Sequence, residues 1–155
     1  MPRPSADAPN GAWTDPDCPV ARTLDLVGDR WSLLVVRDAM DGVRSFTEFQ
    51  RRTGVARNIL SDRLRKLGAH GLLARQTAAT GRRLEYVLTD KGRDLFPVLL
   101  ALRQWGEHHA FDPGEPHSTL VDEQGVRVPD LTPTGADGTR LTSDSTRVRK
   151  ADGSR

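Results

Sequence analysis

The stretch SFTEFQRRTGVARNILSDRLRKLGAHG, residues 45–71, contains two helix patterns separated by a short turn. Ser45 followed three residues later by Glu48 has the spacing of a capping box, which predicts a short helix ending at Gly54. A longer, basic helix is expected from about residue 56 to 70, because its leucines recur at helical spacing. That apolar stripe consists of Leu60, Leu64 and Leu67. Two helices joined by a turn containing glycine predict a helix-turn-helix.

Other elements are expected on both sides of this stretch. Pro19 suits the first position of a helix, where its missing N–H costs nothing. Two β-prone segments enclose a small polar loop, which predicts a β-hairpin with a basic tip. Pro97 lies inside a long helical pattern, so a kink or restart is expected there. The expected elements are helices over 18–28 and 29–41, strands over 72–77 and 84–88, and a helix over 89–110.

This order of elements predicts a mainly α fold with a small β-hairpin wing, a winged helix-turn-helix. We expect a flexible leader over 1–17, the winged helix-turn-helix domain with its dimerisation helices over 18–111, and a C-terminal extension over 112–155. The extension is β-prone and repeats a turn pattern weakly, at 121–126 and 135–141, which predicts short hairpins. Residues 143–155 have the composition of a disordered end.

Length and composition narrow the class of protein. A chain of 155 residues with 36% apolar residues fits one domain with a thin core, which favours an oligomer. One cysteine excludes an intramolecular disulfide, a cysteine-rich zinc site and an iron–sulfur cluster. No run approaches the ~18 apolar residues of a membrane helix, and the first 20 residues lack the apolar core of a signal peptide. We therefore expect a cytoplasmic protein without a membrane partner.

The charge is concentrated in the middle of the chain. Residues 44–83 hold ten arginines and lysines against two acidic residues, a net charge of +8, while the whole chain carries +2. A basic middle between acidic flanks indicates a polyanionic partner such as double-stranded DNA. The alternative is an arginine-rich surface that only contacts solvent.

The leucine stripe determines which side chains of the 56–70 helix face outward. A helix of this kind fits the major groove of DNA, and a hairpin tip can reach phosphates or the minor groove beside it. The residues expected to face the bases are Arg57, Asn58, Ser61 and Arg65. The residues expected to contact phosphates or the minor groove are Arg63, Lys66, Arg82 and Arg83.

Several short motifs resemble those of the HxlR-type transcription regulators, which are related to the MarR regulators. They are Cys18-Pro19, Gly28-Asp29-Arg30-Trp31, Phe46, Leu60-Ser61-Asp62-Arg63-Leu64, Gly71-Leu72, Leu88-Thr89-Asp90-Lys91-Gly92 and Trp105-Gly106. The resemblance covers about residues 18–109. It implies a bacterial homodimer that pairs through its first and last helices and binds near-palindromic operators.

The chain departs from the family pattern at two places. Ala56 stands where the family often has a hydroxyl residue that caps the recognition helix. The absence of that cap costs about 1 kcal/mol of helix stability. Some relatives carry paired cysteines in the C-terminal tail, and this tail has none. We therefore expect no metal and a structural or dimer-bracing role for the extension.

Cys18 is a candidate sensor of oxidants or electrophiles. A helix N-terminus and Arg22 one turn later both favour the thiolate, and the resemblance implies sensing of quinones, aldehydes or oxidants at this position. The alternative is a half-buried interface residue whose neighbours Asp15 and Asp17 oppose the thiolate. A rival signal is a small effector bound between the helices of the dimer. Aromatic residues would line such a pocket, although their helical spacing first predicts a place in the core. They are Trp31, Phe46, Phe49, Phe96 and Trp105.

No enzyme motif is present, and the adjacent His108 and His109 point about 100° apart on a helix, a poor shared metal site. We therefore expect no cofactor and no catalysis. The sequence predicts a sequence-specific DNA-binding regulator, a dimeric repressor released by a small effector or by modification of Cys18. An activator, or a winged-helix protein-interaction module without specific DNA binding, is the alternative.

Overall fold

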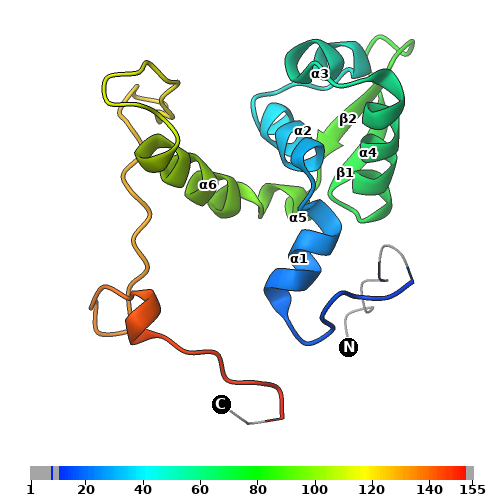
Figure 1. Ribbon diagram of the computed structural model, residues 1–155. Helices are drawn as coiled ribbons and strands as arrows, with labels where there is room; N and C mark the ends of the chain where they lie inside the picture. Colours follow the sequence, from blue (N-terminus) through cyan, green and yellow to red (C-terminus); the bar gives the residue numbers. More distant parts are fainter. Residues whose placement is uncertain (1–7, 9–10, 153–155) are drawn as a thin grey trace. The chain divides into compact units, whose positions relative to one another are not determined.

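The computed structural model describes residue 8 and residues 11–152, and the chain forms two compact units, Met1–Phe96 and Pro97–Arg155 (Figure 1). The helices and strands are α1 (Pro19–Val27), α2 (Arg30–Met40), α3 (Phe46–Thr53), α4 (Arg57–Ala69), β1 (Leu73–Thr77), β2 (Leu84–Leu88), α5 (Asp90–Arg93) and α6 (Phe96–His109). The structure thus confirms the mainly α fold with a small hairpin.

Side chains at the first turn explain where most of these helices begin. Asp29 accepts hydrogen bonds from the amides of Trp31 and Ser32, at 3.1 and 3.0 Å, which satisfies N–H groups that a helix leaves unpaired. Ser45 caps α3 through the amide of Glu48. The predicted capping box is only half formed, because the Glu48 carboxylate lies 3.5 Å from Arg51 as an ion pair. Ala56 precedes α4 and supplies no side-chain cap, as its methyl side chain requires.

The core of the first unit lies between α2, α3, α4 and the hairpin (Figure 1). The leucine stripe of α4 is buried, which confirms the orientation inferred from its spacing. Phe49 of α3 is fully buried and meets the ring of Tyr86 on β2 edge-on, with 6.5 Å between the ring centroids. The remaining buried apolar residues of this unit are Val27, Val35, Val36, Val43, Val55, Leu72 and Leu73.

The hairpin is an antiparallel pair in which Leu73 lies opposite Leu88 and Thr77 opposite Leu84. The amide of Tyr86 donates a 2.8 Å hydrogen bond to the carbonyl of Arg44, which joins β2 to the segment before α3. Register and attachment together fix the hairpin beside the helix-turn-helix, with its loop projecting beyond it (Figure 1).

The long helix expected over 89–110 is two helices, α5 and α6. The interruption agrees with the predicted restart, because α6 begins at Phe96, one residue before Pro97, and proline is tolerated in a first helical turn. Gly92 in α5 is buried against the backbone carbonyl of Leu72, and a Cβ there would overlap that oxygen. The close approach of α5 to the hairpin therefore requires glycine.

The second unit consists of α6 and the C-terminal extension. Gln104 is buried and clamps the extension twice, since its amide donates to the carbonyl of Pro129 at 2.9 Å and accepts from the amide of Leu131 at 2.7 Å. Isolated bridges pair 121 with 127 and 134 with 140, where short hairpins were predicted. A 3-10 turn, Ser143–Ser145, lies within the stretch expected to be disordered.

The segment before α1 contacts that helix. Thr14 donates to the carboxylate of Asp25 through both its amide and its hydroxyl, at 2.9 and 2.7 Å. These bonds lower the pKa of Asp25 from its ordinary value. Most of the leader predicted over 1–17 lies outside the described residues, and this contact attaches its last part to α1.

Candidate nucleic-acid interface

The N-terminal end of α4 carries an exposed polar surface beside the start of α3. An open hollow of about 620 Å³ is lined there by Phe46, Arg57, Asn58 and Ser61. The guanidinium carbon of Arg57 lies 4.8 Å from the centre of the Phe46 ring, a cation–π distance that favours one orientation of the guanidinium. Three of the four residues predicted to face bases therefore lie together, on the solvent side of the leucine stripe.

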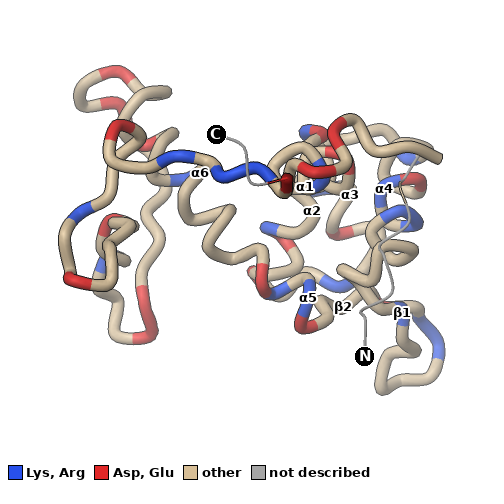
Figure 2. The backbone as a smooth tube through the Cα atoms, turned by 90° about the horizontal axis from the view of Figure 1, so that it is seen from below, with Lys and Arg blue, Asp and Glu red and all other residues tan. Residues whose placement is uncertain are grey.

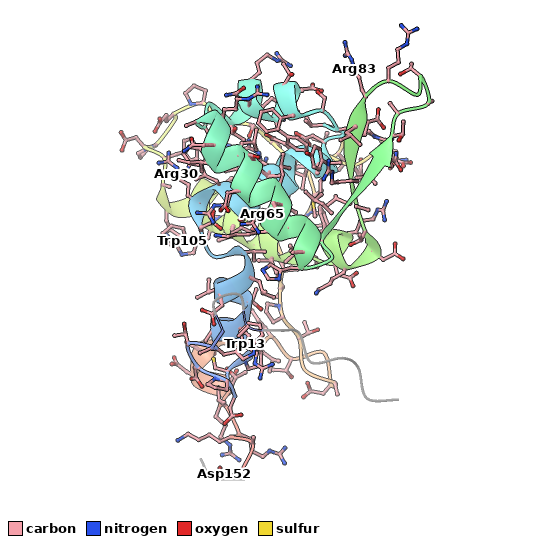
Figure 3. All side chains as sticks on the ribbon, turned by 90° about the vertical axis from the view of Figure 1, so that its right-hand side faces the viewer. Trp13, Arg30, Arg65, Arg83, Trp105 and Asp152 are labelled. Atoms are coloured by element: carbon pink, nitrogen blue, oxygen red, sulfur yellow. The ribbon has the colours of Figure 1, made fainter. Side chains whose placement is uncertain are left out.

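The middle of α4 holds its cations around one carboxylate. Asp62 lies 2.7 Å from Arg65 and 3.0 Å from Lys66. The hydrogen bonds from Lys66 and Arg65 hold the pKa of the Asp62 carboxyl below its usual value. Both cations remain partly exposed (Arg65 is labelled in Figure 3), so a base edge could compete with Asp62 for Arg65 and a phosphate could compete for Lys66.

Arg63 occupies a different place from the one predicted. Its side chain is 25% exposed, its Nε lies 3.1 Å from Oδ2 of Asp29, and its guanidinium reaches Asp62 at 3.4 Å. The Nε atom is buried and has no aligned hydrogen bond to any described residue, so its contact with Asp29 is an ion pair. Arg63 connects α4 to the cap of α2. Its assignment as a phosphate contact stays a prediction that these pairs disfavour.

The wing tip places two arginines in solvent. Arg82 and Arg83 are exposed in the loop between β1 and β2, and neither forms an ion pair with a described residue. Arg83 is labelled at this loop in Figure 3. The loop is closed by the amide of Ala78, which donates to the carbonyl of Arg83 at 2.7 Å. In Figure 2, blue segments mark Lys and Arg on α4 and at this loop, as well as on other elements of the first unit. An exposed, unpaired cation is the kind of side chain that exchanges its counterions for phosphate.

An ion cluster around the buried Asp38 was missed by the sequence analysis. Asp38 is fully buried on α2; its Oδ1 lies 2.8 Å from Arg37 and 3.4 Å from Arg52 of α3, while its Oδ2 has no hydrogen-bond partner among the described residues. Arg52 also reaches Asp41 at 2.6 Å, the hydrogen bond that contributes most to its raised pKa. These pairs connect α2 to α3. A lone Asp in an amphipathic helix gives no sequence signal for such a position.

Cys18 is the N-cap of α1, as predicted, and its Sγ lies 3.5 Å from the amide nitrogen of Ala21. The cation expected beside it points elsewhere, because Nε of Arg22 donates to the carbonyl of Pro16 at 2.7 Å and its guanidinium stacks on Trp13 at 4.7 Å. The thiol is half-buried. The structure therefore provides the helix N-terminus near the sulfur, without a contact to Arg22.

The aromatic residues considered for an effector pocket lie in different surroundings. Phe49 is a core residue, Phe46 lines the hollow on α4, and Trp31 stacks with Arg30 at 4.9 Å. On α6, Phe96 and Trp105 are exposed. Among the residues that the structure describes, no cluster of His, Cys, Asp and Glu could hold a metal, and no helix is long and apolar enough to span a membrane.

Comparison with known proteins agrees with this geometry. The model of the HxlR-like helix-turn-helix family matches residues 26–112, more than half of the chain. The chain belongs to the HxlR-like helix-turn-helix family. The uncharacterized HTH-type transcriptional regulator Rv3095 of Mycobacterium tuberculosis is 45% identical over 98 residues, which are 63% of this chain and 62% of that protein. The HTH-type regulator YybR of Bacillus subtilis, also uncharacterized, is 36% identical over 58% of this chain and 74% of its own length.

Solved structures of similar proteins match different shares of this chain. The crystal structure of PA1607 is 50% identical with a TM-score of 0.83 and covers 86% of this chain and 95% of its own. The redox regulator HypR in its oxidized form is 35% identical with a TM-score of 0.55 and covers 62% of this chain and 100% of its own. The match to PA1607 exceeds the share that residues 18–111 comprise, so it includes much of the extension, whereas HypR matches about one domain. By description, Rv3095 and YybR are transcriptional regulators and HypR is a redox regulator, in agreement with the regulator expected from the sequence.

Proposed function

We propose that this HxlR-like protein is a homodimeric, sequence-specific DNA-binding regulator that represses transcription. The observation that carries the proposal is the exposed surface of α4 and the wing. Arg57, Asn58 and Ser61 line an open hollow at the end of α4, and Arg82 and Arg83 project from the wing without acidic partners among the described residues. This is the arrangement in which a helix enters the major groove while a wing contacts the adjacent backbone.

Dimerisation is supported by apolar side chains that the chain leaves uncovered. On α1, Val20 and Leu24 are exposed one turn apart. On α6, Val98, Leu102 and Trp105 form an exposed stripe, with Trp105 66% exposed, whereas Gln104 of the same helix is buried under the extension. A second copy of the chain would cover these stripes, and a dimer would present two copies of α4 to a near-palindromic operator.

Release of DNA is assigned to one of two signals, a small effector or modification of Cys18. The half-buried thiol at the start of α1 lies on a helix that also carries the exposed Val20 and Leu24. An adduct at Cys18 would therefore add volume next to a surface proposed to be a dimer contact. HypR, a relative whose structure is solved in an oxidized form, is described as a redox regulator.

The test is binding of the purified protein to the DNA that flanks its own gene, beside a shuffled duplex, across a salt series. A preference of ~10³-fold or more for the native duplex is expected for a specific regulator. Arg57→Ala and Arg82→Ala are each expected to weaken binding to the native duplex, and unchanged affinity in both variants would refute the proposed interface. Equal, steeply salt-dependent binding to both duplexes would favour a protein-interaction module.

The signal is tested by treating the protein with a quinone before the binding measurement. Loss of binding in the wild type but not in Cys18→Ser would identify Cys18 as the sensor. Retained binding in both proteins would remove Cys18 from the mechanism and leave the small effector.

A further inference from the structure

The hollow at the end of α4 has one apolar wall in an otherwise polar lining. Phe46 supplies that wall, and Arg57, Asn58 and Ser61 supply the rest. Phe46 is the first residue of α3 and is only half-buried, unlike Phe49 of the same helix, which is fully buried. A half-buried ring among groove-facing polar residues has apolar surface left to contact a ligand.

Arg57 lies against this apolar wall. Its guanidinium carbon lies 4.8 Å from the Phe46 centroid, and no ion pair joins Arg57 to an acidic residue within the described part of the chain. A contact between a guanidinium and a ring face uses none of the N–H donors. Arg57 is thus held on the ring while its donors remain free, and the bidentate partner that suits them on DNA is the N7 and O6 edge of guanine.

We propose that this hollow reads a thymine directly 5′ of a guanine, with Arg57 on the guanine and Phe46 on the thymine methyl group. This inference rests on the proposed function. The C5-methyl of thymine is the apolar group that bases present in the major groove, and Phe is one of the residues that contact it. A purine beside the guanine would bring its polar N7 edge against Phe46, which offers it no hydrogen bond, and such a loss is costly in a dry contact. Cytosine would bring a C5–H in place of the methyl group and lose that apolar contact.

The proposal assigns the two residues separate roles. Arg57 selects the guanine. The plane of its guanidinium and the Phe46 ring together form the surface that the thymine methyl group covers. Asn58 and Ser61 line the polar side of the hollow and remain available to the neighbouring base or phosphate. Phe46 is therefore a specificity-determining residue supplied by α3, outside the helix that enters the groove.

The test begins with selection of bound duplexes from a random pool by the full-length protein, followed by replacement of the thymine in the selected TG step by deoxyuridine. This replacement removes only the methyl group. Wild type is expected to lose about fourfold in affinity, the factor that corresponds to one buried methyl group. Phe46→Ala is expected to lose less than twofold on the same replacement, and deoxyuridine at a thymine outside the step should change wild-type affinity by less than twofold.

Arg57→Lys provides a second variant that keeps the charge and α3 unchanged. It is expected to weaken the preference for guanine in this step, because lysine lacks the planar guanidinium that stacks on Phe46, and to respond to deoxyuridine by less than twofold. The test therefore holds even where circular dichroism shows that Phe46→Ala does not fold. Specific binding to a consensus without the TG step, or an equal deoxyuridine effect in wild type and in the variants, would overturn the inference alone. A selection that yields no consensus would overturn the proposed function with it.

Discussion

Replacing Asp29 by alanine should destabilise the protein by about 2–4 kcal/mol. The carboxylate caps α2, worth about 1 kcal/mol. It also accepts the hydroxyl hydrogen bond of Ser32 at 2.5 Å, and that hydroxyl belongs to a residue that is 2% exposed, so leaving it unpaired costs about 1–3 kcal/mol. The ion pair with Arg63 is partly exposed and adds at most about 1 kcal/mol.

Urea unfolding followed by circular dichroism measures this loss. With a slope of about 2 kcal/mol per molar urea, the midpoint should fall by about 1–2 M while the slope stays constant. Asp29→Asn is the matched control, because asparagine retains the capping oxygen and loses the charge opposite Arg63, and it should cost less than about 1 kcal/mol. A loss below about 1 kcal/mol in Asp29→Ala would show that water replaces these bonds, and the assigned role of Asp29 would then be wrong.

Three further outcomes are expected. Removing both Arg82 and Arg83 should reduce the slope of log affinity against log salt by about 3–4, for two phosphate contacts in each half-site, and an unchanged slope in fluorescence anisotropy titrations would place the wing off the DNA. Gly92→Ala should prevent or severely weaken folding because its methyl would overlap a backbone carbonyl. Gly68→Ala on α4, whose methyl would lie 3.9 Å from the carbonyl of Leu73, should instead stabilise by up to about 1 kcal/mol in thermal unfolding. Burial and two nearby lysines lower the pKa of His70 from 6.5. Acidification below about pH 6.5 therefore protonates His70 in the unfolded chain first and lowers the free energy of unfolding. His70→Gln should flatten this pH dependence in urea titrations, and an unchanged profile would contradict the role of His70.

Features that depend on local periodicity could be predicted from the sequence. The leucine stripe, the cap at Ser45, the hairpin and the restart near Pro97 are all confirmed. Each depends on residues within a few positions of one another, so a helical or strand period is sufficient to identify it. The same period placed Arg57, Asn58 and Ser61 on one exposed surface, where the structure has them.

Features that depend on contacts between distant residues could not be predicted. Arg63 lies on the flank of α4 in any helical projection, and only the packing of α2 brings Asp29 to it. Asp38 and Gln104 are polar residues in amphipathic helices, and their burial follows from partners 14 and 27 residues away, respectively. Periodicity states which face a residue occupies, and it contains no information on what will cover that face.

The carboxylate in the middle of α4 has a consequence for how such a protein would find its site in a genome. Asp62 acts as an internal counterion for Arg65 and Lys66, so both cations would have to leave an existing partner before they contact DNA. On random DNA only phosphate contacts replace the ion pairs with Asp62, whereas an operator also offers base contacts to the same helix. Asp62 would thus shorten each dwell on non-cognate DNA more than it weakens the final complex, which speeds the search at a small cost in affinity.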